Sequence, residues 1–141
     1  MTTIVANRKG MAADMRAAGA GAVFKTAKLH RVNGSIIGFC GSIEQALQFI
    51  EWRRHPDTKP TFNEPDFIAI ELTADGRLVW WGSEMVAVPI EDDHYAVGSG
   101  AAYALGAMAA GATVKKAIQI AATYDANTGT EVQTLMLGRK S

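Results

Sequence analysis

Tight-turn residues recur between short runs of β-forming residues, and this spacing constrains the fold more than any other feature of the 141-residue chain. Residues 7–10 are Asn-Arg-Lys-Gly, Asn33-Gly34 separates two apolar runs, and residues 74–77 are Ala-Asp-Gly-Arg. Asn-Gly and Asp-Gly pairs are typical of hairpin turns because these residues tolerate a positive φ. Helical patterns do not separate every pair of predicted strands. The sequence therefore predicts an α+β domain of antiparallel sheets with helices outside, rather than a doubly wound parallel sheet.

Strand and helix patterns follow one another in blocks along the chain. Strands are expected over residues 2–6, 11–14, 24–29, 35–40, 67–72, 77–81 and 130–137, with shorter apolar segments at 84–90 and 95–97. Ser42 and Gln45 form a capping box for a helix that ends before Pro56. Two further helices are expected, an alanine-rich one that ends near Gly111 and one over 114–123 that Thr113 caps. Loops are predicted at 17–22, which is rich in small residues, and at 92–94.

Composition and charge favour a single globular domain over residues 1–141. Apolar residues make up 48% of the chain, and its 14 basic residues equal its 14 acidic ones, so a polyanion-binding surface is not expected. The N-terminus has no basic segment followed by a long apolar run, and the Ala/Gly-rich stretch 96–112 is too short and interrupted to span a bilayer. We therefore expect a soluble cytoplasmic protein with no nucleic-acid partner and no membrane partner.

Cysteine and histidine usage gives no indication of metal or redox chemistry. Cys40 is the only cysteine, which excludes an intrachain disulfide and fits a reducing compartment. It lies in an apolar run and is predicted to be an unreactive core thiol. The three histidines, His30, His55 and His94, are scattered along the chain. Neither a metal site nor a cofactor is expected.

Six short segments are spread in order over nearly the whole chain. They are Thr2-Thr3-Ile4-Val5-Ala6 after Met1, Ala12-Ala13-Asp14, Ala27-Lys28-Leu29-His30-Arg31, Gly38-Phe39-Cys40-Gly41-Ser42, Tyr95-Ala96-Val97-Gly98-Ser99-Gly100, and Tyr124-Asp125-Ala126-Asn127-Thr128-Gly129. In the same order, they resemble segments of the proteasome and HslV-type N-terminal nucleophile (Ntn) hydrolases. No single segment is specific, and it is their conjunction in order that carries the resemblance. The late segment has threonine where the family has serine.

The resemblance implies a four-layer αββα fold with two antiparallel sheets. The family usually has two helices after the turn that contains Gly41, whereas residues 42–65 have room for one, so one helical layer would be shortened. The chain would then be a short, divergent bacterial or phage homologue. The resemblance also implies homo-oligomeric rings that act on peptides or unfolded proteins inside a chamber, and it leaves open whether an ATPase regulator takes part.

The resemblance assigns the nucleophile to Thr2, exposed at the chain terminus once Met1 is removed. A threonine hydroxyl is a weak nucleophile and needs an adjacent base, which the terminal amine of the same residue supplies. That amine has an ordinary pKa of about 7.7–8.0. Lys28 would lower this pKa further by like-charge repulsion, and Asp14 would keep Lys28 charged and oriented. Aligning Lys28 needs a small gap, so Lys25 is the alternative for the lysine role.

Further roles follow from the same resemblance. The backbone N–H of Gly41 would stabilise the oxyanion of the tetrahedral intermediate, where one donor contributes on the order of 3 kcal/mol in comparable enzymes. Ser99, Asp125 and Thr128 would hydrogen-bond around the amine and relay protons. Two apolar residues would line the first specificity pocket and favour a modest hydrophobic side chain before the scissile bond, Phe39 and Ile43.

Each of these residues also has a plainer interpretation when taken alone. Thr2 would be the first residue of a strand, Asp14 a strand-end or turn carboxylate, Lys28 a solvated strand lysine, Ser99 a helix N-cap, and Asp125 the cap of a turn.

Two functions other than a threonine peptidase also stay open. The shortened helical layer and the replaced serine fit a proteasome-shaped ring scaffold without peptidase activity, and the same nucleophile would also serve hydrolysis of small amides.

Overall fold

The computed structural model describes residues 2–19 and 21–138, which form three antiparallel sheets and three helices. The helices are α1 (Ile43–Arg54), α2 (Ala101–Ala109) and α3 (Val114–Tyr124). The strands are β1 (Thr3–Asn7), β2 (Gly10–Asp14), β3 (Arg16–Gly19), β4 (Ala22–Lys25), β5 (Leu29–Val32), β6 (Ser35–Gly41), β7 (Phe67–Leu72), β8 (Leu78–Trp81), β9 (Ala87–Ile90), β10 (His94–Gly98) and β11 (Val132–Met136).

The strands pair in the orders β10-β1-β2-β11, β3-β4 and β5-β6-β7-β8-β9. Every pairing is antiparallel, which confirms the α+β class with antiparallel sheets. The Asn33-Gly34 pair forms the predicted hairpin turn between β5 and β6, with φ of 50° and 86° at its two residues. Positive φ at both central positions is what a tight two-residue hairpin requires.

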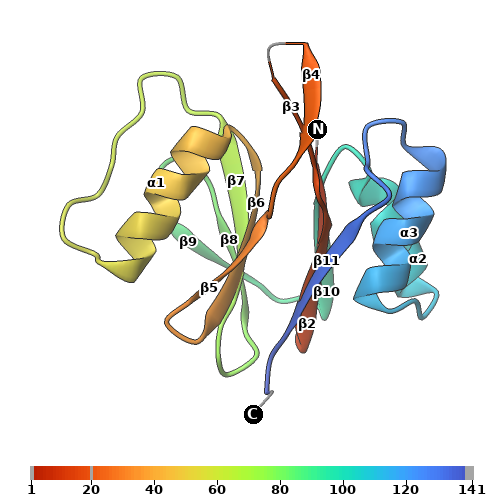
Figure 1. The fold of residues 1–141 in the computed structure, drawn as a ribbon. Coiled ribbons are helices and arrows are strands. Elements are labelled where there is room, and N and C mark those ends of the chain that lie inside the picture. The colour runs from red at the N-terminus through yellow and green to blue at the C-terminus, as the bar shows by residue number, and fades with distance from the viewer. Residues whose placement is uncertain (1, 20, 139–141) are drawn as a thin grey trace.

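The two larger sheets face each other, and helices cover their outer faces (Figure 1). Alternate residues of β1 point in opposite directions, so Ile4 and Ala6 pack between the sheets while Val5 packs under the helices. α1 buries Phe49 and Ile50 against the five-stranded sheet. α2 and α3 pack on the four-stranded sheet. No helix of the described residues has the length and apolar character needed to cross a bilayer.

Two predictions about residues 17–29 were wrong. Residues 17–22 were expected to form a loop, but β3 and β4 lie there and add a third, two-stranded sheet to the two expected. Alanine and glycine have low strand propensity, so the backbone pairing of this hairpin gave no side-chain pattern to detect. The strand expected over 24–29 is interrupted after Lys25 and resumes at Leu29, which leaves Lys28 between two strands.

Smaller differences concern the segment before α2. The apolar segment 84–90 does extend the five-stranded sheet, but only from Ala87 onward, because Met85 has a φ of 63°. His94 was expected in an exposed loop and is instead the first residue of β10, paired with Asn7.

The single helix between Ser42 and Pro65 is confirmed as α1, with the Ser42 hydroxyl accepting from the Gln45 N–H as a cap.

Candidate active site

Thr2 lies immediately before β1 and borders a cavity of about 560 Å3 at the end of the sheets. Six of the nine predicted site residues line this cavity, although they come from segments far apart in the sequence. The complete lining is Thr2, Arg16, Ala17, Ala18, Lys28, Phe39, Cys40, Gly41, Ile43, Asp66, Gly98 and Ser99.

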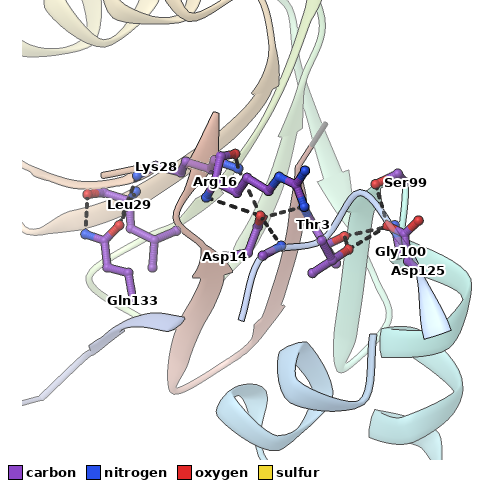
Figure 2. Close-up of polar contacts among 11 residues, drawn as sticks. Thr3, Asp14, Arg16, Lys28, Leu29, Ser99, Gly100, Asp125 and Gln133 are labelled. Atoms are coloured by element: carbon purple, nitrogen blue, oxygen red, sulfur yellow. Dashed lines mark hydrogen bonds and ion pairs between the residues drawn. The ribbon is translucent and has the colours of Figure 1, made fainter. Parts of the chain in front are cut away.

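Asp14 and Lys28 form a buried ion pair beside this cavity. The Lys28 Nζ lies 3.1 Å from the Asp14 Oδ1, and the two side chains are 2% and 0% exposed. The same carboxylate accepts from the Thr3 N–H and the Gly129 N–H, both at 2.9 Å (Figure 2). Asp14 therefore connects β1, the lysine and the loop after α3. Asp14 does end β2, as its plainer interpretation stated, but it is buried and paired with Lys28, whereas the plainer interpretation of Lys28 as a solvated lysine is wrong.

Burial lowers the pKa of Lys28, and the charge of Asp14 and its hydrogen bond oppose that lowering. The ammonium group also donates to the carbonyl of Arg16. Lys25, the alternative for the lysine role, is exposed and pairs with Glu131 at 2.7 Å, away from the cavity lining. Of the two lysines, Lys28 is the one that lines the cavity together with Thr2.

A chain of hydroxyl groups leads from the interior to Asp125. The Gly100 N–H donates to the Thr3 Oγ1 at 2.8 Å, and the Thr3 and Thr128 hydroxyls lie 2.8 Å apart. Thr128 and Ser99 both donate to the Asp125 Oδ2 at 2.6 Å. Because the proton of Thr128 is directed at Asp125, the hydroxyl of Thr3 donates to that of Thr128. The chain therefore has one direction of donation, from the α2 N-terminus to the carboxylate.

The hydrogen bonds from Ser99 and Thr128 lower the pKa of Asp125, so this carboxyl is ionised at neutral pH. Ser99 is not the side-chain cap of α2, because the helix begins after Gly100 and has no capping side chain. Asp125 does lie at the C-terminal end of α3, as its plainer interpretation stated, and it binds the two hydroxyls as well. Thr3, which the sequence analysis did not single out, is fully buried and central to this chain.

Gly41 ends β6 at the rim of the cavity with a φ of 98°. A Cβ atom at this position would lie 2.4 Å from the carbonyl oxygen of Asp66 and 2.9 Å from the Cα of Phe67. Both contacts are with backbone, which cannot rotate away as a flexible side chain can. The close approach of the two strands and the turn into α1 therefore require glycine.

Gly41→Ala is expected to destabilise the protein by at least about 2 kcal/mol, because it adds a backbone clash to a left-handed conformation. Urea unfolding gives the measurement. Gly106→Ala is the matched control, since Gly106 lies in α2 with nothing within 4 Å of an added Cβ. That control should stabilise by about 0.5–1 kcal/mol through helix propensity. Equal stability of the two variants would contradict the argument.

The two predicted specificity residues both border the cavity. Phe39 is 2% exposed, and its ring stacks on His30 at a centroid distance of 5.8 Å. Ile43 is the first residue of α1 and is half-buried. Sequence analysis missed Arg16 and Asp66, which bring one charge of each sign to the lining. Ordinary surface charges carry no sequence pattern that would have indicated this position.

Cys40 borders the same cavity and is half-buried, so its predicted place in the core is only partly correct. Burial raises the pKa of its thiol, which favours the protonated and less nucleophilic form. Within the described ranges, His, Cys, Asp and Glu side chains form no group of three or more that could hold a metal ion.

No family model matches the sequence, and no curated protein matches it. Solved structures do match its fold over nearly its whole length. BPH of Thiobacillus denitrificans in complex with epoxomicin superimposes with a TM-score of 0.74 at 17% identity, over 97% of this chain and 98% of that chain. Eukaryotic HslV from Trypanosoma brucei superimposes with a TM-score of 0.76 at 21% identity, over 97% and 99%.

The chain has the proteasome and HslV-type fold. The agreement covers 97% of this chain, which leaves too few residues outside it to omit a whole strand such as β1 or β11. It confirms at the level of the fold the resemblance drawn from short segments of sequence. In this HslV-type fold the cavity beside Thr2 is lined by residues from eight of the chain's elements and connections.

Proposed function

We propose that this protein is a threonine-type peptidase whose nucleophile is the hydroxyl of Thr2. One observation carries the proposal: Thr2 borders the same cavity as Lys28, Gly41 and Ser99. Thr3, the other threonine of the pair, is 0% exposed and its hydroxyl is held by hydrogen bonds. Only Thr2 is therefore placed to reach a substrate. Met1, whose removal the reaction needs, lies outside the described residues.

The proposed reaction begins with attack of the Thr2 hydroxyl oxygen on the carbonyl carbon of a peptide bond. The free α-amine of Thr2 takes the hydroxyl proton and later gives a proton to the departing amine. The ammonium of Lys28, held by Asp14, keeps the pKa of the α-amine low enough for it to act as a base. The resulting ester is hydrolysed by water, which restores Thr2. No cofactor takes part.

Two other groups serve this reaction in the proposal. The backbone N–H of Gly41 stabilises the oxyanion, which is the charge that develops in the transition state. The hydroxyl of Ser99, fixed by its 2.6 Å bond to Asp125, lies in the cavity lining and orients the α-amine and the reacting water. Asp125 and Thr128 act through Ser99 and Thr3 rather than on the substrate, since neither lines the cavity.

We propose peptides or unfolded proteins as substrates, with a modest hydrophobic side chain bound against Phe39 and Ile43. The proposal includes homo-oligomeric rings in the cytoplasm, with catalysis in their inner chamber. The packing of α1, the two larger sheets, and α2 with α3 supports an αββα layering in which the α1 layer is shortened to one helix.

The decisive experiment is the mass of the native protein before and after treatment with an epoxyketone. This class of probe is chosen because the similar BPH structure holds epoxomicin. We expect the untreated mass to lack Met1, and the treated protein to carry one adduct that fragmentation places on residue 2. Met1 retained in fully folded protein would refute the mechanism.

Two other outcomes would support the alternative functions. Assembled rings that neither cleave peptides nor react with the epoxyketone would support the inactive scaffold. Turnover of small amides without turnover of peptides would support the amidohydrolase.

A further inference from the structure

Lys28 reaches its place beside Asp14 from a stretch of chain that belongs to no strand. β4 ends at Lys25 and β5 begins at Leu29, so among the described residues 26–28 take part in no strand pairing. A lysine side chain is long and flexible, so the position of its ammonium group depends on how firmly its main chain is held. A contact other than strand pairing must hold that main chain.

The side chain of Gln133, on β11, makes three hydrogen bonds to this part of the main chain. Its Oε1 accepts from the Lys28 N–H at 2.9 Å and from the Leu29 N–H at 3.1 Å. Its Nε2 donates to the Leu29 carbonyl at 3.0 Å (Figure 2). Two N–H donors face one atom of the amide and a carbonyl faces the other, so the partners define which is oxygen and which is nitrogen.

β11 connects this contact with the strand that carries Asp14. In the β2–β11 pairing, Val132 lies opposite Asp14, and Gln133 is the next residue along. Val132 packs toward the helices whereas Leu135 packs between the sheets, so Gln133 points to the same side as Leu135. The β2–β11 pair therefore places Asp14 directly and Lys28 through Gln133.

We propose that Gln133 is a positioning residue, whose side-chain amide fixes the main chain of Lys28 so that its ammonium lies between Asp14 and the cavity. The catalytic consequence rests on the proposed function. The placement of the ammonium does not, and it can be measured in protein that has no substrate at all.

The test compares Gln133→Met, which keeps the length of the side chain and removes all three hydrogen bonds, with Leu135→Val. The control loses core packing on the same strand and on the same side, and it leaves the three hydrogen bonds of Gln133 in place. Gln133→Asn, one methylene shorter, replaces the methionine variant if that variant does not fold. Folded fractions are matched by circular dichroism before each measurement.

The first measurement is acetylation of lysines by an N-hydroxysuccinimide ester, located by mass spectrometry. Lys28 is 2% exposed, and it should react slowly in the wild type. We expect Gln133→Met to raise its rate roughly 10-fold over Leu135→Val, because loss of the contact allows local opening. Equal rates in the two variants would overturn the inference, since Gln133 would then hold the sheets together without placing the lysine.

The second measurement is peptide turnover as a function of pH. Gln133→Met should lower kcat roughly 10- to 100-fold with KM nearly unchanged, the effect of a misplaced group. The rising limb of kcat should also move to higher pH, because a displaced ammonium repels the protonated α-amine less. A fall in kcat shared equally by Leu135→Val would count against positioning. A wild type that is inactive toward peptides and epoxyketone would refute the proposed function, while the acetylation result would still decide the role of Gln133.

Discussion

Thr2→Ala is expected to abolish peptide turnover, with a fall in kcat on the order of 10^4- to 10^6-fold, the range seen when a nucleophile is removed. The fold should persist. Thr2 is half-buried, and its carbonyl accepts from the Ser99 N–H at 2.9 Å, a main-chain contact that the substitution does not remove. Turnover of a fluorogenic peptide and the mass of the epoxyketone-treated protein are the two measurements, and the adduct should be absent.

Thr3→Ala is the matched control, since it removes the same hydroxyl one residue further on. The Gly100 N–H would lose its acceptor inside the protein, which costs about 1–3 kcal/mol of stability. The adduct on Thr2 should still form. Turnover or an adduct that survives Thr2→Ala would contradict the assignment of the nucleophile, and loss of the adduct only in Thr3→Ala would transfer that assignment to Thr3.

The strands with turn chemistry at their ends and apolar residues along them could be predicted from sequence. β6 and β7 match the apolar runs over 35–40 and 67–72, and Asn33-Gly34 gives the turn before β6. β5 was not predicted in its place, because it lies over residues 29–32 and the expected strand covered 24–29. The capping box of Ser42 and Gln45 predicted the start of α1. The candidate site was predictable only as an ordered set of segments, and the structure brings six of its nine residues to one cavity.

The contacts that hold the site together could not be predicted in this way. The side-chain amide of Gln133 binds the main chain of Lys28 and Leu29, which are more than 100 positions away in the sequence. A single glutamine in a strand forms no sequence pattern from which its hydrogen-bond partner could be predicted. The role of Thr3 could not be predicted for a different reason. Thr3 is adjacent to Thr2 in sequence, and the two differ only in the direction of their side chains at the start of β1. Thr3 faces the interior, whereas Thr2 lines the cavity.

Lys28→Met is expected to destabilise the protein by about 3 kcal/mol, because removing one partner of a buried pair leaves the other charge uncompensated. Asp14 would keep three main-chain donors, the N–H groups of Thr3, Arg16 and Gly129, which limits the loss. Asp14→Ala should be worse, at about 5 kcal/mol, since it leaves the ammonium and all three N–H groups without that acceptor. Urea unfolding at neutral pH measures the order of the two variants.

Lys25→Met gives the matched control, because it makes the same substitution in the exposed pair with Glu131. An exposed ion pair contributes about 0–1 kcal/mol, so this variant should unfold close to the wild type and keep its turnover. A loss of stability no larger in Lys28→Met than in Lys25→Met would show that the buried pair does not support the fold. Folded Lys28→Met with undiminished turnover would show that the α-amine of Thr2 works without a neighbouring ammonium. The two outcomes are independent, so stability and turnover test separately whether Asp14 and Lys28 hold the sheets together and whether they also activate the nucleophile.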